Sequence, residues 1–273
     1  MLTLLAVFGI LSLIVAVHEF GHLVAARLCG VHVYKYSIGF GRALPGLRRR
    51  IGATEYQIGW LPLGGFVAVA SRREKPPAGH EPVADEHTIE AQTFRVRAII
   101  LLAGIALNIV LGSVLIGIAI GGARGGFDLG VLDTALMMPG QALVMFWQAL
   151  STIGPKDVHT VAVVGPLTAH AASVGWEAVV LLAGLISIEV AIFNALPIPV
   201  TDGGQLLIAA WERVSGRRLS RVAHRNLCYS AYAVVLGILL VGLVNDARAY
   251  RVWIDTGSAD AVVTSLMDER SAP

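Results

Sequence analysis

Hydrophobic residues along the chain are concentrated in four long segments that are separated by more polar stretches. A helix that crosses the hydrocarbon core of a bilayer, about 30 Å thick, needs roughly 17–25 mainly apolar residues, and each segment has that length. The pattern therefore predicts an α-helical polytopic membrane protein with four transmembrane helices, organised as one membrane-embedded domain over residues 1–273. The predicted spans are about 2–28, 98–120, 174–196 and 227–244.

The connection between the first two spans has another pattern, with glycines and short runs of β-forming residues from 31 to 69. Such runs, bounded by turn residues, predict a small membrane-associated β-hairpin region. One interpretation gives this hairpin no functional role. The other makes Gly39, Phe40 and Gly41 part of an edge strand that pairs with an extended substrate, because strand addition supplies main-chain hydrogen bonds to almost any sequence.

Basic residues indicate how the chain is oriented. Sixteen of the 21 Lys and Arg residues lie in the first and third connections, counted from Arg27 at the end of the first span to Arg97 and from Arg213 to Arg225. The positive-inside rule therefore places these connections in the cytosol and both termini outside it. Residues 132–153, with Trp147 and three methionines, then lie outside and predict an amphipathic helix on the membrane surface. The first segment is predicted to be a retained span, since no Lys or Arg precedes Arg27 as in a signal peptide.

The overall composition agrees with a membrane protein. Charged residues make up 15% of the chain, against about 25% in a typical soluble domain. The formal net charge of +2 is small, and the basic residues form no reading face, so nucleic acid is excluded as a partner. Two cysteines, Cys29 and Cys228, provide neither a disulfide framework nor a CxxC metal motif.

The first span contains the motif His18-Glu19-Phe20-Gly21-His22. Positions i and i+4 of a helix share a face, so both imidazoles can bind one metal ion, and Glu19 lies beside them as a general base. A chance HExxH in an ordinary helix is the alternative interpretation. The apolar surroundings argue against it, because ionisable groups inside a membrane helix are costly without a partner.

A third ligand is predicted just after the third span. Pro197 and Pro199 must break the helix, and irregular backbone at membrane depth is tolerated where it lines a cavity. Asp202 could then return toward the two histidines, and two His with one carboxylate and an open position form a catalytic zinc arrangement. Alternatively, Asp-Gly-Gly simply caps the following helix, residues 205–214. In the second span, Asn108 either joins helices through hydrogen bonding or has a role beside the metal.

These motifs resemble the site-2 protease family of intramembrane zinc metalloproteases, in the bacterial branch of the regulator-of-sigma-E protease. The matching segments cover most of the chain in the family's order: 18–22, 37–44, 54–56, 61–67, 165–166, 194–199 and 202–204.

The resemblance implies that His18, His22 and Asp202 bind Zn²⁺ and that Glu19 is the catalytic base. It also implies that Asn194 and Pro197 hold an unwound substrate.

We therefore expect an enzyme of the bacterial inner membrane, with transmembrane proteins or peptides and the lipid bilayer as its partners. It would cleave peptide bonds within or near transmembrane helices, as in the processing of anti-sigma factors or signal-peptide remnants. Two alternatives are a membrane zinc transporter and a catalytically silent scaffold. The first would need more spans and a polar path, and the second would be favoured by the loss of Glu19 or Asp202, both of which are present.

The sequence departs from the family pattern in three places. Only about 53 residues, 121–173, lie outside between the second and third spans, which leaves no room for the usual PDZ domains. Selection of pre-trimmed substrates would then be looser or would depend on a separate upstream protease or adaptor. The usual Ala-Gly-Pro of the second span reads Ala-Gly-Ile at 103–105, and Val-Thr replaces Pro-Leu at 200–201.

Overall fold

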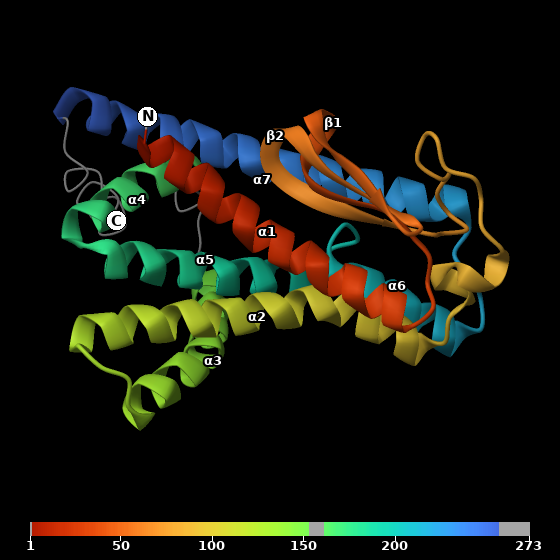
Figure 1. Cartoon of the computed structure of the whole chain (residues 1–273), viewed down its shortest axis with the longest axis horizontal. Coiled ribbons are helices and arrows are strands. Elements are labelled where there is room, and N and C mark those ends of the chain that lie inside the picture. Colours follow the sequence, from red (N-terminus) through yellow and green to blue (C-terminus); the bar gives the residue numbers. More distant parts are fainter. Residues whose placement is uncertain (1, 153–160, 257–273) are drawn as a thin grey trace. The chain divides into compact units, whose positions relative to one another are not determined.

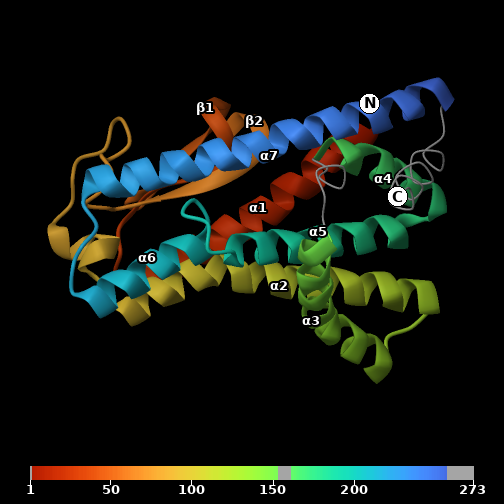
Figure 2. The same ribbon diagram turned by 180° about the vertical axis from the view of Figure 1, so that it is seen from behind.

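The computed structural model describes residues 2–152 and 161–256 (Figure 1 and Figure 2). It is mainly helical, with one small sheet near the N-terminus. The helices are α1 (Leu2–Leu28), α2 (Phe94–Arg124), α3 (Leu129–Thr152), α4 (Val161–Val174), α5 (Trp176–Ala195), α6 (Asp202–Ser215) and α7 (Arg221–Thr256), with short 3-10 turns η1 (Asp85–His87) and η2 (Ile89–Ala91).

Five of the described helices are long and apolar enough to cross a membrane. Four of them, in α1, α2, α5 and α7, coincide with the predicted spans. The fifth lies in α3, over Leu129–Gln148, where the sequence predicts a surface segment from 132 to 153. Residue 153 lies outside the described residues. Length and hydropathy alone do not separate a short span from a surface helix, so the count of four spans stays a prediction.

The described residues form two compact units. One contains residues 8–111 and 189–229, and the other contains 2–7, 112–152, 161–188 and 230–256. Every predicted catalytic, metal-binding and substrate-binding residue belongs to the first, which we call the site unit.

The predicted β region is a sheet of two long antiparallel strands, β1 (Val33–Ile51) and β2 (Thr54–Val69), rather than several short ones. Residues 35–38 of β1 pair with residues 65–68 of β2 on one side and with residues 55–58 of β2 on the other, so Tyr36 pairs with both Val67 and Tyr56. Gly39 and Gly41 have φ of +81° and +86°, a conformation that side-chain-bearing residues rarely adopt. The bends that the glycines permit let the two strands fold back on themselves.

The base of the sheet packs on the end of α1. A buried apolar cluster joins Leu23 and Ala26 of α1, Val33 and Tyr36 of β1, and Ile100 of α2. The Tyr36 hydroxyl also donates a 2.7 Å hydrogen bond to the Ala16 carbonyl of α1. Burial and the nearby Glu19 carboxylate of α1 raise the pKa of Tyr36 to about 12. The Tyr36 hydroxyl therefore keeps its proton and remains a donor at neutral pH. The sheet is thus fixed against α1 two residues before the HExxH motif begins.

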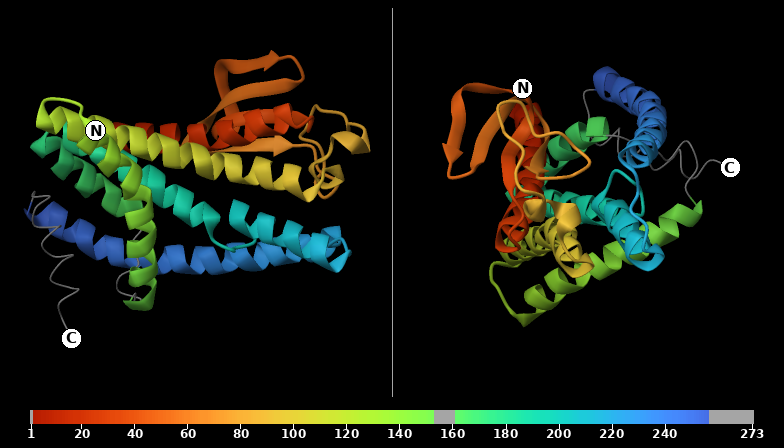
Figure 3. Two further views of the ribbon diagram at one scale, coloured as in Figure 1. Left: turned by 90° about the horizontal axis from the view of Figure 1, so that it is seen from below. Right: turned by 90° about the vertical axis from the view of Figure 1, so that its right-hand side faces the viewer.

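In the second unit, α2 and α5 approach closely through glycines. A Cβ atom at Gly112 would lie 2.8 Å from the Gly184 carbonyl oxygen, and one at Gly184 would lie 2.8 Å from Ile116. Small residues allow such backbone approach in membrane helix pairs. Helix α3 belongs to the same unit and runs steeply across the C-terminal half of α2 (Figure 3).

Candidate metal centre

The HExxH motif lies in the last third of α1, where helical geometry places both imidazoles on one face. The Nε2 atoms of His18 and His22 are 3.2 Å apart, and the rings meet edge to face. His18 is buried and His22 nearly so. Two imidazole nitrogens this close, away from bulk water, require a shared proton or a shared cation to be stable.

Asp202 completes the cluster from the first residue of α6. Its Oδ2 atom lies 3.1 Å from His18 Nε2 and 3.2 Å from His22 Nε2. Tetrahedral zinc with bonds of about 2.0–2.1 Å would hold such donor atoms about 3.3 Å apart, so the observed triangle fits the ion. Within residues 2–152 and 161–256, these three side chains form the one group of His, Cys, Asp or Glu residues with donor atoms close enough to bind a metal ion.

The alternative in which Asp202 only caps the following helix does not fit the local geometry. Thr201 is the N-cap residue, and its hydroxyl oxygen accepts from the Gly204 N–H at 3.4 Å. The same hydroxyl donates to the Leu196 carbonyl at 2.6 Å, which closes the loop between α5 and α6. The Asp202 carboxylate is therefore left to face the histidines.

Glycines let the backbone segments that carry the ligands come together. A Cβ atom at Gly21 would lie 2.5 Å from the Ala103 carbonyl oxygen, so α1 and α2 cross at that point. A Cβ atom at Gly104 would lie 2.5 Å from His22 Nε2. In the Asp-Gly-Gly segment, a Cβ atom at Gly203 or Gly204 would collide with carbonyl oxygens of the preceding loop. The loop can fold back over the start of α6 because both positions lack side chains.

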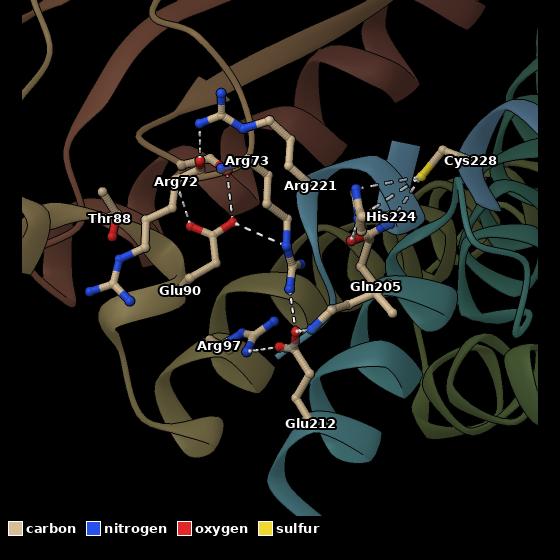
Figure 4. Close-up of polar contacts among 12 residues, drawn as sticks. Arg72, Arg73, Thr88, Glu90, Arg97, Gln205, Glu212, Arg221, His224 and Cys228 are labelled. Atoms are coloured by element: carbon tan, nitrogen blue, oxygen red, sulfur yellow. Dashed lines mark hydrogen bonds and ion pairs between the residues drawn. The ribbon is translucent and has the colours of Figure 1, made fainter. Parts of the chain in front are cut away.

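A second set of contacts, which the sequence analysis did not find, holds the same loop from α7. The Gln205 side-chain amide donates to the Pro199 carbonyl, and His224 Nε2 donates to Gln205 Oε1 at 3.0 Å (Figure 4). Cys228, one turn after His224, donates to the same Pro199 carbonyl at 3.6 Å. Gln205 lies one turn beyond Asp202, so these bonds fix the loop on both sides of the candidate ligand. The sequence offered one signal for these contacts, namely a polar residue within a mainly apolar segment. That signal does not identify which residue the polar side chain contacts.

The far end of α6 is held by an ion cluster, also shown in Figure 4. The buried carboxylate of Glu212 accepts from Arg73, from Arg97 at 2.8 Å and from the Leu219 N–H at 2.8 Å. Burial opposes ionisation of Glu212, but the Arg97 hydrogen bond, the Leu219 N–H and the Arg73 charge together lower its pKa. The outer face of the helix is apolar, with Leu207, Trp211 and Val214 exposed.

Glu19 lies beside the triangle. Its carboxylate is within electrostatic range of His18, His22 and Asp202 and is hydrogen-bonded by the Val67 backbone. A Cβ atom at Gly65 would lie 3.6 Å from Glu19 Cγ, so β2 passes directly over this side chain. Gly65 and Val67 of the sheet therefore lie next to the candidate base.

The predicted substrate-binding glycines lie elsewhere in the same sheet. A Cβ atom at Gly39 would lie 2.8 Å from the Leu61 carbonyl oxygen, and one at Gly41 would collide with the Trp60 ring. Phe40 is 44% exposed and stacks on Phe66. Their part in substrate binding remains a prediction.

The two predicted substrate-binding residues after the third span lie at the end of α5. Asn194 is half-buried in the last turn and donates to the Val190 carbonyl at 3.0 Å, and Pro197 is exposed in the loop. Both are in the site unit, on the chain segment that leads to Asp202. Their role in binding substrate also remains a prediction.

The second ring nitrogen of each candidate ligand faces α2. His22 Nδ1 lies 2.8 Å from the Ile100 carbonyl oxygen, and the Asn108 amide lies 3.4 Å from His18 Nδ1. Asn108 is completely buried. Of the two interpretations of this residue, the position beside the metal site is the one that the contact supports.

Comparison with known proteins gives a consistent picture. The model of peptidase family M50 matches residues 6–238. RseP of Salmonella typhimurium, a regulator of sigma-E protease, is 44% identical to this chain over 100 residues, and RseP of Escherichia coli is 40% identical over 100 residues. Each match covers 37% of this chain and 21% of the relative. The Synechocystis protein slr1821, provisionally named a zinc metalloprotease, is 39% identical over 109 residues, which are 40% of this chain and 28% of that protein.

The matched stretch is thus a small part of each relative, whereas the family model spans most of the chain. With its several apolar helices, the chain is a multi-pass membrane protein. It belongs to peptidase family M50.

Proposed function

We propose that this protein is an intramembrane zinc metalloprotease of the site-2 type, which hydrolyses peptide bonds within or near transmembrane helices. The observation that carries the proposal is the triangle of His18, His22 and Asp202, with donor atoms 3.1–3.2 Å apart and Glu19 beside it. A family match over residues 6–238 supports the same reaction class. The inner membrane of a bacterium is its expected location.

In this proposal His18, His22 and Asp202 hold the zinc ion. The bound ion supplies Lewis acidity, which polarises the scissile carbonyl and brings the pKa of water to about 7. Glu19 accepts the proton of the attacking water and later transfers it to the leaving amine. The hydrogen bond with the Val67 backbone keeps the carboxylate oriented toward the histidines.

Substrate must reach Glu19 in an extended form, because the amides of an intact helix are hidden in intrahelical hydrogen bonds. The Gly65–Val67 stretch of β2 lies against Glu19 and supports strand addition at this edge of the sheet. Gly39, Phe40 and Gly41 then shape the sheet that presents this edge. Asn194 and Pro197, in the segment leading to Asp202, hold the other side of the unwound substrate.

We also infer four spans, with α3 on the membrane surface and both termini outside the cytosol. Sixteen of the 21 basic residues lie in the first and third connections, and α3 runs steeply across α2 in its unit (Figure 3). A helix across a membrane-spanning neighbour lies near the membrane plane. Single cysteines at Arg49 and Gly126, in a background lacking Cys29 and Cys228, should react with an impermeant thiol reagent from opposite sides. Reaction from the same side would exclude this topology.

The reaction is tested with the full chain in detergent and a fluorogenic transmembrane peptide. Glu19→Gln should retain zinc and lose cleavage, whereas His22→Ala should lose both. Full zinc occupancy in both His22→Ala and Asp202→Ala would disprove the ligand assignment. In proteoliposomes, zinc flux that survives Glu19→Gln would favour the transporter alternative, since transport needs no general base.

A further inference from the structure

The two candidate histidine ligands are each supported from α2, but by groups of different chemistry. His22 Nδ1 faces the Ile100 backbone carbonyl at 2.8 Å, and His18 Nδ1 faces the side-chain amide of Asn108 at 3.4 Å. A carbonyl can only accept a hydrogen bond, whereas an amide can accept or donate. This difference makes Asn108 a residue that can control the chemistry of His18.

A neutral imidazole that binds a metal through Nε2 must carry its one proton on Nδ1. The Ile100 carbonyl enforces that tautomer in His22, since it accepts the Nδ1 proton. His18 presents Nε2 to the triangle in the same way, because this is the atom 3.1 Å from Asp202. Its Nδ1 therefore needs an acceptor as well.

The structure places the Asn108 nitrogen nearest to His18 Nδ1. In that orientation the amide donates, the imidazole proton moves to Nε2, and the lone pair needed by the metal is lost. The amide oxygen and nitrogen are nearly equal in shape and are assigned from their hydrogen bonds. A half-turn of the amide would place the oxygen, in place of the nitrogen, beside His18 Nδ1.

We propose that Asn108 is a positioning residue whose amide oxygen accepts the Nδ1 proton of His18 and thereby keeps Nε2 free for zinc. The inference rests on the metal site proposed above and adds a residue outside the ligand set. Asn108 follows Gly104 by one helical turn, so the two share a face of α2. Gly104 leaves space for the imidazoles, and Asn108 selects the tautomer of one of them.

Burial strengthens the argument. Asn108 has no exposed surface, and placing an amide inside an apolar helix is costly unless it is hydrogen-bonded. A residue that only joins helices would serve as well with its amide in either orientation. A residue that selects the His18 tautomer must present an acceptor, and this requirement separates the two roles in an experiment.

The test compares Asn108→Asp, which offers only acceptor atoms, with Asn108→Leu, which branches at the same carbon, is larger and has no acceptor. Val110→Ala, at an exposed position of the same helix, is the control. Zinc affinity of the purified full chain is measured by competition with a chromophoric chelator. Loss of a hydrogen-bond partner behind a ligand typically costs 10–100-fold in metal affinity. We expect that loss for Asn108→Leu and wild-type affinity, within about threefold, for Asn108→Asp and Val110→Ala.

A second measurement covers the case in which Asn108→Leu does not fold. Nitrogen-15 spectra of the histidine-labelled, zinc-loaded wild type should show a protonated Nδ1 and a ligated Nε2 for His18. A protonated Nε2, wild-type affinity in Asn108→Leu, or equal weakening in Asn108→Asp and Asn108→Leu would overturn the inference. A His22→Ala variant with wild-type zinc affinity would instead overturn the metal site itself, so the two failures are distinguishable.

Discussion

Gly104 lies directly against His22: a Cβ atom at this glycine would be 2.5 Å from Nε2 and 2.9 Å from His18 Cε1. Gly104→Ala should therefore displace the imidazoles and lower zinc affinity at least tenfold. The overpacking should also cost about 1–3 kcal/mol of stability. The check is the zinc content of the purified variant after gel filtration. Gly117→Ala is the matched control on α2, because its added methyl would meet Ala135 at an ordinary 3.5 Å and should leave the zinc in place.

The sequence predicts the parts of the site that depend on local geometry. Two histidines four residues apart share a helix face wherever the helix lies, and two nearby prolines end a helix in any context. The contacts of Asn108 with His18 and of Gln205 with His224 depend on how helices distant in the sequence cross. Periodicity carries no information about such crossings, so these partners could not be predicted.

The sheet illustrates the same limit. Its existence follows from the β-forming residues and glycines of 31–69, but which stretch faces the metal site depends on the register. In the observed register Gly65 pairs with Ile38 and Val67 pairs with Tyr36, and both β2 residues lie near Glu19. A single register shift changes which residues face the helix, and local pattern does not specify it.

Gln205 provides a test of the loop that carries Asp202. Gln205→Leu removes the hydrogen bond to Pro199 and leaves the His224 donor without its acceptor. Because the His224 donor is half-buried, its loss of a partner should cost about 1 kcal/mol, so the melting temperature should fall and zinc should bind more weakly. Leu207→Ala, on the exposed face of the same helix, should change neither quantity. Unaltered zinc binding in Gln205→Leu would mean that the contacts of Thr201 and Cys228 are enough to hold the loop.

Glu212 makes a prediction about pH. Its pKa is lowered in the folded protein, so its contribution to stability is complete above the ordinary value of 4.5 and is lost as the pH falls through the folded value. Glu212→Gln removes the carboxylate charge that faces Arg73 and Arg97, although Arg73 keeps Glu90 at 4.0 Å, and should cost about 3 kcal/mol at pH 7. The difference from wild type should shrink below pH 4.5.

Thermal unfolding in detergent at several pH values measures this effect. Asp85→Asn is the control, because the Asp85–Arg72 pair is exposed and should contribute little. A deficit for Glu212→Gln that stays constant from pH 7 to pH 4 would refute the electrostatic account.

The two glycine sites of the sheet should respond differently to substitution. A methyl at Gly65 would lie 2.7 Å from the Ser37 carbonyl oxygen and 3.2 Å from Val15, so Gly65→Ala should displace the stretch of β2 that lies against Glu19 and lower the turnover rate. Gly41→Val should clash with Trp60, distort the sheet and depress cleavage by weakening substrate binding. Zinc content should be normal in both. Steady-state kinetics separate a change in kcat from a change in KM, and equal profiles for the two variants would argue against distinct roles.

The connection between α2 and α5 predicts how substrates gain access. Its described residues form α3 and α4, and a bulky outer domain on a substrate would meet little else there. Removing such a domain should therefore change the cleavage rate of the purified enzyme only weakly. The experiment uses one transmembrane substrate with and without a folded outer domain. A strong preference for the trimmed form that persists after deletion of α3 would place the size selection elsewhere.

The positions of the three candidate ligands along the chain also affect the biogenesis of the protein. His18 and His22 emerge early in synthesis, but Asp202 follows only after most of the other helices have been made. Under the proposed ligand assignment, a nascent chain therefore has only two of its three ligands until α6 has been made. We expect cleavage to require α6, so a chain truncated before Asp202 should bind zinc more weakly than the full chain.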